Sequence, residues 1–134
     1  MTSNPIIWSP DASRVQASAM HRFMRQQGFD NYDSLYQWSI EHAPEFWEAV
    51  CKFCDIRFSK AATRTLSHAD SIIDATWFEG SQLNYAANLL RHDDDKLALI
   101  FSGETGIRRE ISHSELRSEV AAIAAGLKAA GVAK

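Results

Sequence analysis

Two cysteines in a Cys-x-x-Cys spacing, Cys51 and Cys54, are the first side chains in this sequence that could do chemistry. Such a pair serves either as a redox dithiol or as half of a zinc site. Zinc needs about four ligands, and neither a second cysteine pair nor a His-x-x-x-His motif follows. A redox pair opens a helix that follows a strand, whereas this pair lies late in a helical pattern, after Phe46 and Val50. We therefore interpret both cysteines as structural thiols.

Histidines and one acidic run are the other groups that could bind a metal or move a proton. The histidines are scattered without metal-ligand spacing, so surface or capping roles are expected for all five: His21, His42, His68, His92 and His113. The run Asp93–Asp95 lacks the glycine and glutamate of a calcium loop and is interpreted as a solvated loop. No G-x-S-x-G nucleophile elbow occurs. The sequence therefore assigns no catalytic, cofactor-binding or metal-ligating residue.

Two pairs of side chains are interpreted as structural. Trp77 and Phe78 are expected to anchor one segment of the chain against another, rather than to form a ligand platform. Asn84 and Asn88 lie one helical turn apart, and their side chains could bond to backbone groups at a join to the next domain.

Helical patterns fill the first half of the chain. Ser9–Pro10 predicts the N-cap and first position of a helix that ends at Gly28. A second helix is expected to begin near Asp33–Ser34, and Pro44 opens a third. The third helix should be deeply packed, since apolar residues cover a wide arc of it. The stripe of the first helix consists of Val15, Ala19 and Phe23.

The middle of the chain is harder to interpret than its flanks. Ile56 and Phe58 alternate with polar residues, which favours a short strand. Residues 59–70 are mixed polar and typical of a surface loop. After Trp77–Gly80, apolar residues at helical spacing predict a helix that ends before the acidic run: Leu83, Ala86, Ala87, Leu89 and Leu90.

The last third of the chain predicts a strand, a turn, a strand and a helix. Leu97–Phe101 is a continuous apolar run typical of a buried strand, and Ile107–Ile111 can return beside it. Ser112–Glu115 forms a capping box, and Gly131 ends the helix that this box begins. Because a hairpin and one helix leave apolar faces uncovered, we expect them to begin a larger α/β domain.

The expected fold class is therefore α+β, mainly α. Residues 1–92 are predicted to form a helical N-terminal subdomain, and residues 93–134 a strand–turn–strand–helix unit. The chain has 134 residues and a formal charge of -3, with basic residues scattered, so nucleic acid is not an expected partner. No apolar run reaches the roughly 20 residues of a membrane span. Met1–Pro5 does not resemble the start of a signal peptide, so the cytoplasm is expected.

Several motifs together resemble the start of the acetyl- and acetoacetyl-CoA synthetase branch of the adenylate-forming enzymes. The most specific stretch, Trp77–Leu90, is similar to the family pattern WF-x-G-x-x-LNYAENLL, with Ala87 where glutamate is usual. Trp8–Pro10 and Tyr36–Ile40 also match, and Ser114–Val132 is similar to the family's L-T-W-x-E-L-R…L-x-x-x-G-V segment. Within this branch the opening and the spacing from Trp38 to Trp47 are closer to acetoacetate–CoA ligases. The resemblance covers roughly the first fifth of such an enzyme.

The resemblance implies a two-step reaction that uses ATP, Mg²⁺ and CoA. A carboxylate attacks the α-phosphate of ATP to give an acyl-adenylate and pyrophosphate, and the CoA thiol then displaces AMP. The resemblance also implies that residues 93–134 begin the AMP-binding domain, and that the whole enzyme acts in lipid and ketone-body metabolism.

One segment is similar to the family's phosphate loop, whose core is S-G-T-T-G followed by a lysine. In Ser102–Gly106, however, Glu104 would place a carboxylate against anionic phosphates, and Ile107–Glu110 contains no Pro-Lys. The segment also lies upstream of the family's loop. We interpret it as a hairpin turn, and expect this chain alone to bind no cofactor.

The leading hypothesis is therefore a structural N-terminal fragment of an acetoacetate–CoA ligase that is inactive alone. Its expected partner is the remainder of the ligase. The alternative is a stand-alone interaction module that forms a homodimer through uncovered strand edges and helix faces. A third hypothesis is a small-molecule-binding domain unrelated to the ligases.

Overall fold

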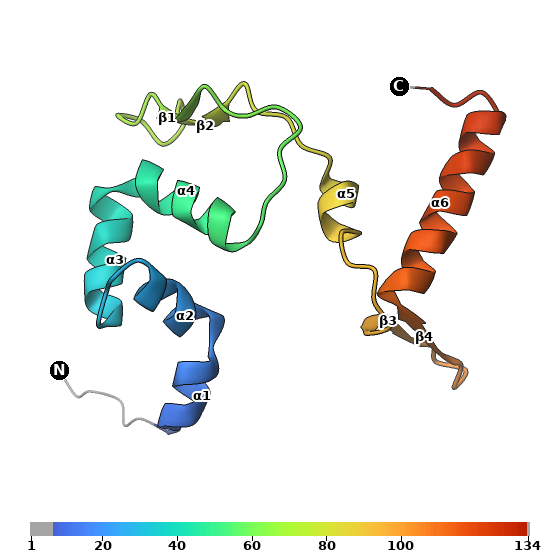
Figure 1. The fold of residues 1–134 in the computed structure, drawn as a ribbon, viewed down its shortest axis with the longest axis horizontal. Coiled ribbons are helices and arrows are strands. Elements are labelled where there is room, and N and C mark those ends of the chain that lie inside the picture. The colour runs from blue at the N-terminus through green and yellow to red at the C-terminus, as the bar shows by residue number, and fades with distance from the viewer. Residues whose placement is uncertain (1–6, 134) are drawn as a thin grey trace. The chain divides into compact units, whose positions relative to one another are not determined.

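The computed structural model describes residues 7–133 (Figure 1). Its contacts divide the chain into two compact units, Met1–Gln82 and Leu83–Lys134. The described residues form six helices and two antiparallel hairpins, which confirms the mainly α, α+β fold. The family-domain boundary after residue 92 stays a prediction, because contacts alone do not define it. Met1–Pro5, interpreted above as unlike a signal peptide, lies outside the described residues.

The start predicted for the first helix is wrong by two residues. Helix α1 (Ala12–Ala17) begins after Asp11, not after Ser9. The Asp11 carboxylate accepts a hydrogen bond from the Arg14 amide at 2.8 Å, which satisfies one of the free N–H groups of the first turn. Aspartate and serine are about equally good caps, so the sequence pattern alone did not separate them.

The predicted first helix is also broken in the middle. Ser18 has an extended backbone that ends α1, and its hydroxyl accepts a hydrogen bond from the His21 amide at 3.1 Å. Ser18 therefore also caps the next helix, α2 (Ala19–Gln26). Gly28 follows with a φ of +83°, the left-handed conformation in which glycine stops a helix, as predicted.

The second and third helices are confirmed. Helix α3 (Tyr32–Glu41) is capped by Asn31, whose side chain accepts a hydrogen bond from the amide of residue 34. Helix α4 (Ala43–Phe53) has a proline in its first turn, at Pro44. The residue between the two helices, His42, occupies a capping position but its side chain makes no capping hydrogen bond.

The core of the first unit lies where α2, α3 and α4 meet. Its buried residues are Phe23, Met24 and Leu35, and half-buried aromatic and aliphatic side chains surround them. The Phe23 ring packs edge-on against Phe46, with centroids 5.9 Å apart, and against Phe53 at 5.2 Å. The deep packing predicted for α4 is wrong in this structure, because none of its residues is fully buried.

A hairpin that the sequence did not predict completes the first unit. Strand β1 (Arg64–Ser67) pairs with β2 (Thr76–Glu79) in antiparallel register, and β1 contacts α4. The strand expected at Ile56–Phe58 is wrong, and so is the loop expected over the whole of residues 59–70. Each strand of the hairpin has only four residues and mixes polar with apolar types, so neither shows a clear two-residue period.

The second unit has the predicted order of elements. Helix α5 (Tyr85–Leu89) is followed by β3 (Leu97–Ser102), β4 (Arg108–Ser112) and α6 (His113–Ala129). Strands β3 and β4 pair antiparallel, which confirms the hairpin. The expected burial of β3 is wrong, since none of its residues is buried here.

Candidate functional site

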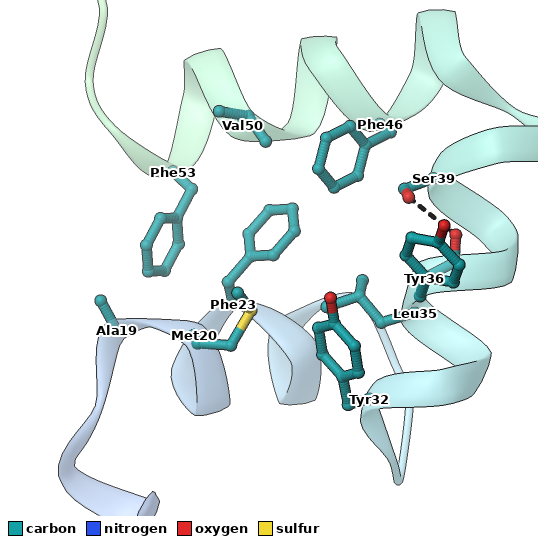
Figure 2. A pocket seen from close by; sticks show the side chains of 10 residues that line it. All are labelled: Ala19, Met20, Phe23, Tyr32, Leu35, Tyr36, Ser39, Phe46, Val50 and Phe53. Atoms are coloured by element: carbon teal, nitrogen blue, oxygen red, sulfur yellow. Dashed lines mark hydrogen bonds between the residues drawn. The ribbon is translucent and has the colours of Figure 1, made fainter. Parts of the chain in front are cut away.

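A cavity of about 270 Å³ lies among α2, α3 and α4 in the first unit (Figure 2). The side chains around it carry no charge, and the hydroxyl of Ser39 already donates a hydrogen bond of 2.7 Å to the Tyr36 carbonyl oxygen. The lining residues are Ala19, Met20, Phe23, Tyr32, Leu35, Tyr36, Ser39, Phe46, Val50 and Phe53. Such a cavity can hold an apolar group, and the tyrosine hydroxyls of Tyr32 and Tyr36 are among its few polar groups, but it offers no charged side chain to neutralise a phosphate.

The two cysteines lie at the C-terminal end of α4, away from the helix N-terminus that a reactive thiolate requires. Both are free thiols; Cys51 is half-buried and Cys54 is exposed. Burial raises the pKa of the Cys51 thiol, and the neighbouring Cys54 adds to this effect. A raised pKa keeps the thiol protonated and unreactive at neutral pH, which favours the structural interpretation of Cys51.

The glycine-bearing segment that resembled a phosphate loop is the turn between β3 and β4. The Gly103 amide donates to the Ile107 carbonyl at 2.8 Å, and the Gly106 amide donates to the Gly103 carbonyl at 3.0 Å. A phosphate loop needs its amides free to face the phosphate. These two amides are used within the turn, so the residues here do not fit an ATP phosphate, as the sequence indicated.

The acidic run Asp93–Asp95 holds the N-terminus of α6, which the sequence did not predict. Asp94 Oδ1 lies 2.6 Å from His113 Nδ1, and the Asp94 carbonyl accepts from the Ser114 amide at 3.1 Å. Asp93 lies 3.6 Å from an Arg117 nitrogen. The run is a loop in which Asp93 and Asp95 are exposed, as predicted, but it also makes contacts with α6. Nothing in the sequence pattern indicated these contacts, because the partners lie about twenty residues apart.

The hydrogen bond from His113 lowers the pKa of Asp94, because it stabilises the carboxylate form. His113 also packs against His92, with ring centroids 5.3 Å apart. Across residues 7–133, no three His, Cys, Asp or Glu side chains converge into a group that could hold a metal ion.

The aromatic and amide pairs have structural contacts within their own units. Trp77 packs edge-on against Trp47 at 6.0 Å, and Phe78 lies 5.7 Å from Phe58, so both rings join β2 to other segments as expected. The Asn84 side chain caps α5 by accepting from the Ala87 amide at 2.9 Å. The Asn88 side chain donates to the Asn84 carbonyl at 3.0 Å, inside the same helix. None of the helices in the described part of the chain is long and apolar enough to cross a bilayer.

Comparison with known proteins indicates which class of protein this chain resembles. Residues 32–89, from α3 to the end of α5, match the family model of the acetyl-coenzyme A synthetase N-terminus. This match spans the third and fourth helices, the unpredicted hairpin and the block Trp77–Leu90. In sequence, this part of the chain is thus similar to the N-terminal region of acetyl-coenzyme A synthetases, a class of acyl-CoA synthetases.

Individual relatives narrow the class. The chain is 40% identical to the acetoacetyl-CoA synthetase of Danio rerio over 95% of its own length, and 33% identical to that of Rhizobium meliloti over 94%. A solved acetoacetyl-CoA synthetase from Streptomyces lividans matches 93% of the chain with a TM-score of 0.78 and 34% identity. The resemblance found in the sequence is confirmed: this chain is related to the N-terminal region of acetoacetyl-CoA synthetases.

The match covers only part of these relatives. The chain spans about a fifth of their length, namely 20% of the Danio rerio protein and 21% of the Streptomyces lividans chain.

Proposed function

We propose that this chain forms the N-terminal region of an ATP-dependent acetoacetate–CoA ligase. The whole enzyme would convert acetoacetate, ATP and CoA into acetoacetyl-CoA, AMP and pyrophosphate, in the ketone-body and lipid metabolism of the cytoplasm. The observation that carries the proposal is the match to acetoacetyl-CoA synthetases over nearly all of the described chain, in sequence and in fold.

The proposed role of the region is structural. ATP, Mg²⁺ and CoA would be bound by the remainder of the ligase, because adenylate transfer needs donors aimed at phosphate and a neutralising cation. The Gly103 and Gly106 amides of the Ser102–Gly106 turn are already used within the turn, and Glu104 adds a negative charge beside them. The cavity of the first unit is lined by uncharged side chains.

An ATP–pyrophosphate exchange assay with acetoacetate tests this role directly. We expect no exchange above background for this chain, and clear exchange for the full-length Streptomyces lividans enzyme as the positive control. Turnover by this chain alone would contradict the structural role.

A second candidate function is a homodimerising module, and the exposure of the second hairpin favours it. Leu97, Leu99, Ile100 and Phe101 are each 50–59% exposed, on a strand with an unpaired edge. Uncovered apolar strands pair readily with another copy. Static light scattering separates the two candidates, since a concentration-independent monomer would count against the homodimer.

A further inference from the structure

The two free cysteines occupy the turn that ends α4. Cys54 is the C-cap residue of this helix, and Cys51 lies three residues before it, in the last helical turn. They are the only cysteines of the chain, so any disulfide within the chain must join these two. Cys54 is exposed and Cys51 is half-buried, so a reagent in solution reaches Cys54 first.

Backbone hydrogen bonds fix the shape of this turn. The Ile56 amide donates to the Cys51 carbonyl at 2.9 Å. The Asp55 amide donates to the Lys52 carbonyl at 3.2 Å. This pair of bonds is the Schellman motif, in which Asp55 takes the left-handed conformation with a φ of +50°. The positions of both cysteines are therefore set by the end of the helix rather than by a flexible loop.

The spacing of the two residues is close to that of a disulfide. Because residues 51–53 are helical, the Cα atoms of Cys51 and Cys54 lie about 5 Å apart. Disulfides join Cα atoms that are roughly 4.4–6.8 Å apart. Cβ atoms one helical turn apart are about 5–6 Å from each other, and a disulfide needs about 3.5–4.5 Å. The bond therefore requires the last turn of α4 to tighten by roughly 1–2 Å.

The surroundings of the turn allow this movement. Cys54 and the two residues that follow it, Asp55 and Ile56, are all exposed. The buried side chains of the first unit come from α2 and α3 rather than from this turn. The end of α4 can therefore tighten without breaking buried packing.

The position at a helix end also determines which reaction the pair can undergo. A catalytic dithiol needs a thiolate that is stabilised at a helix N-terminus, whereas burial raises the pKa of the Cys51 thiol. This argues against an enzyme that oxidises or reduces other proteins. It does not prevent modification of the pair itself. The exposed Cys54 can react first, and Cys51 then has to attack only its neighbour, which proximity accelerates.

We propose that Cys51 and Cys54 form a reversible disulfide when the chain meets a small-molecule disulfide such as glutathione disulfide. The proposal is independent of the proposed ligase function. The Cys54 thiolate attacks one sulfur of the reagent, forms a mixed disulfide and releases one glutathione thiolate. The Cys51 thiolate then attacks Sγ of Cys54, forms the Cys51–Cys54 bond and releases the second. The two protein thiols lose two electrons and two protons, which convert one glutathione disulfide into two molecules of glutathione.

Two features make this disulfide reversible. Cys54 is exposed, so a reducing thiol can reach its sulfur. The tightened turn also strains the bond, and strained or exposed disulfides are the ones that are reduced readily. The pair therefore responds to the redox state around the chain, as a buried structural disulfide would not.

Mass spectrometry of the intact chain under non-reducing conditions tests the proposal. After equilibration with glutathione disulfide at neutral pH, the wild type should lose the mass of two hydrogen atoms and carry no glutathione. Both thiols should return on addition of dithiothreitol. Cys51→Ser should instead keep one glutathione on Cys54, because no second thiol can displace it. Cys54→Ser should react more slowly, since Cys51 is half-buried.

The matched control moves one cysteine without changing their number. In the double variant Glu45→Cys, Cys54→Ser the two cysteines lie six residues apart on α4. Their separation of about 9 Å along the helix axis exceeds the roughly 7 Å that a disulfide can span. This variant should collect glutathione adducts and form no internal disulfide. Circular dichroism checks that each variant is folded.

Several outcomes would overturn the proposal. One is a wild type that stays unmodified, keeps glutathione adducts or forms disulfide-linked dimers in place of the internal bond. Another is closure of the control pair as readily as the native pair, because the turn of α4 would then not direct the reaction. None of these measurements depends on ligase activity, so the proposed function is tested separately.

Discussion

At the scale of single residues, Asp94 has the most specific role in the second unit. Its carboxylate only accepts hydrogen bonds, so the proton shared with His113 lies on the histidine Nδ1. The backbone of the same residue accepts from Ser114, and its side chain also accepts from the Lys96 amide at 3.2 Å. One aspartate thus ties the start of β3 to the start of α6.

This contact makes the stability of the second unit depend on pH. Folding lowers the pKa of Asp94 below its ordinary value of 3.8, so the carboxylate's contribution is fully present above pH 3.8. The contribution is lost as the pH falls through the lowered pKa. We expect Asp94→Asn to reduce the thermal midpoint at neutral pH, and the difference from wild type to shrink in acid. Circular dichroism at 222 nm, recorded over a pH series, measures it.

Asp70→Asn, in the loop between β1 and β2, is the control for the loss of one negative charge. It should leave the pH profile of the wild type unchanged. If Asp94→Asn and Asp70→Asn gave the same profile, the contact with His113 would carry no stability.

At the scale of elements, the capping box of α6 is the best-defined helix start in the chain. The Ser112 hydroxyl accepts from the Glu115 amide at 3.2 Å, and the Glu115 carboxylate accepts from the Ser112 amide at 2.8 Å. Both bonds satisfy N–H groups that a helix leaves free at its first turn. The cap matters more here than in an ordinary helix, because tertiary contacts support only the first part of α6.

Removing the cap should therefore destabilise α6 measurably. We expect Ser112→Ala to lower the free energy of unfolding of the second unit by about 1 kcal/mol. Ser118→Ala, in the interior of the same helix, should be neutral or slightly stabilising, since alanine favours helix and the Ser118 hydroxyl bonds only the Ser114 carbonyl. Urea denaturation measures the free energy of unfolding of both variants. Equal losses for the two would contradict the stabilising role of the cap.

The sequence predicted the ends of helices correctly where a single residue or short motif determines the local backbone. The capping box at Ser112 acts through side chains three residues apart, and Gly28 and Pro44 act through their own backbone conformation; all three are where the sequence placed them. The start of α1 was misplaced because Ser9 and Asp11 are equivalent caps. Strand β1 was missed because its pairing partner lies about twelve residues away and neither strand has a strong period of its own.

In the candidate site, too, the sequence predicted local features but missed contacts between residues far apart in the chain. The sequence correctly indicated that the Ser102–Gly106 turn is no phosphate loop, because Glu104 is visible in it. It did not predict that Asp94 would meet His113, since that contact depends on the return of the hairpin. It also did not predict the cavity among α2, α3 and α4, which follows from helix packing rather than from any motif.

At the scale of the whole molecule, the small size of the core limits stability. Only Phe23, Met24 and Leu35 form the buried apolar core of the described residues, and all three belong to the first unit. Many large apolar side chains stay exposed in both units. The chain therefore depends on few contacts, and each buried residue has a large share in them.

Truncating one buried residue should have a correspondingly large effect. Leu35 is 3% exposed, so Leu35→Ala should lower the free energy of unfolding by roughly 2–5 kcal/mol. Leu89→Ala is the matched change at a side chain that is 60% exposed, and it should have little effect. Equal denaturation midpoints for the two variants would show that the three-helix core does not determine stability.

The border between the two compact units affects how fragments of these ligases can be found in genomes. It falls between Gln82 and Leu83, inside the block Trp77–Leu90 that resembles the ligases most closely. A reading frame interrupted at this point would leave each product with one compact unit, yet neither would retain the complete signature. Genome searches that rely on the whole block would overlook both halves, so screens for fragments of these ligases should score the two sides of the border separately.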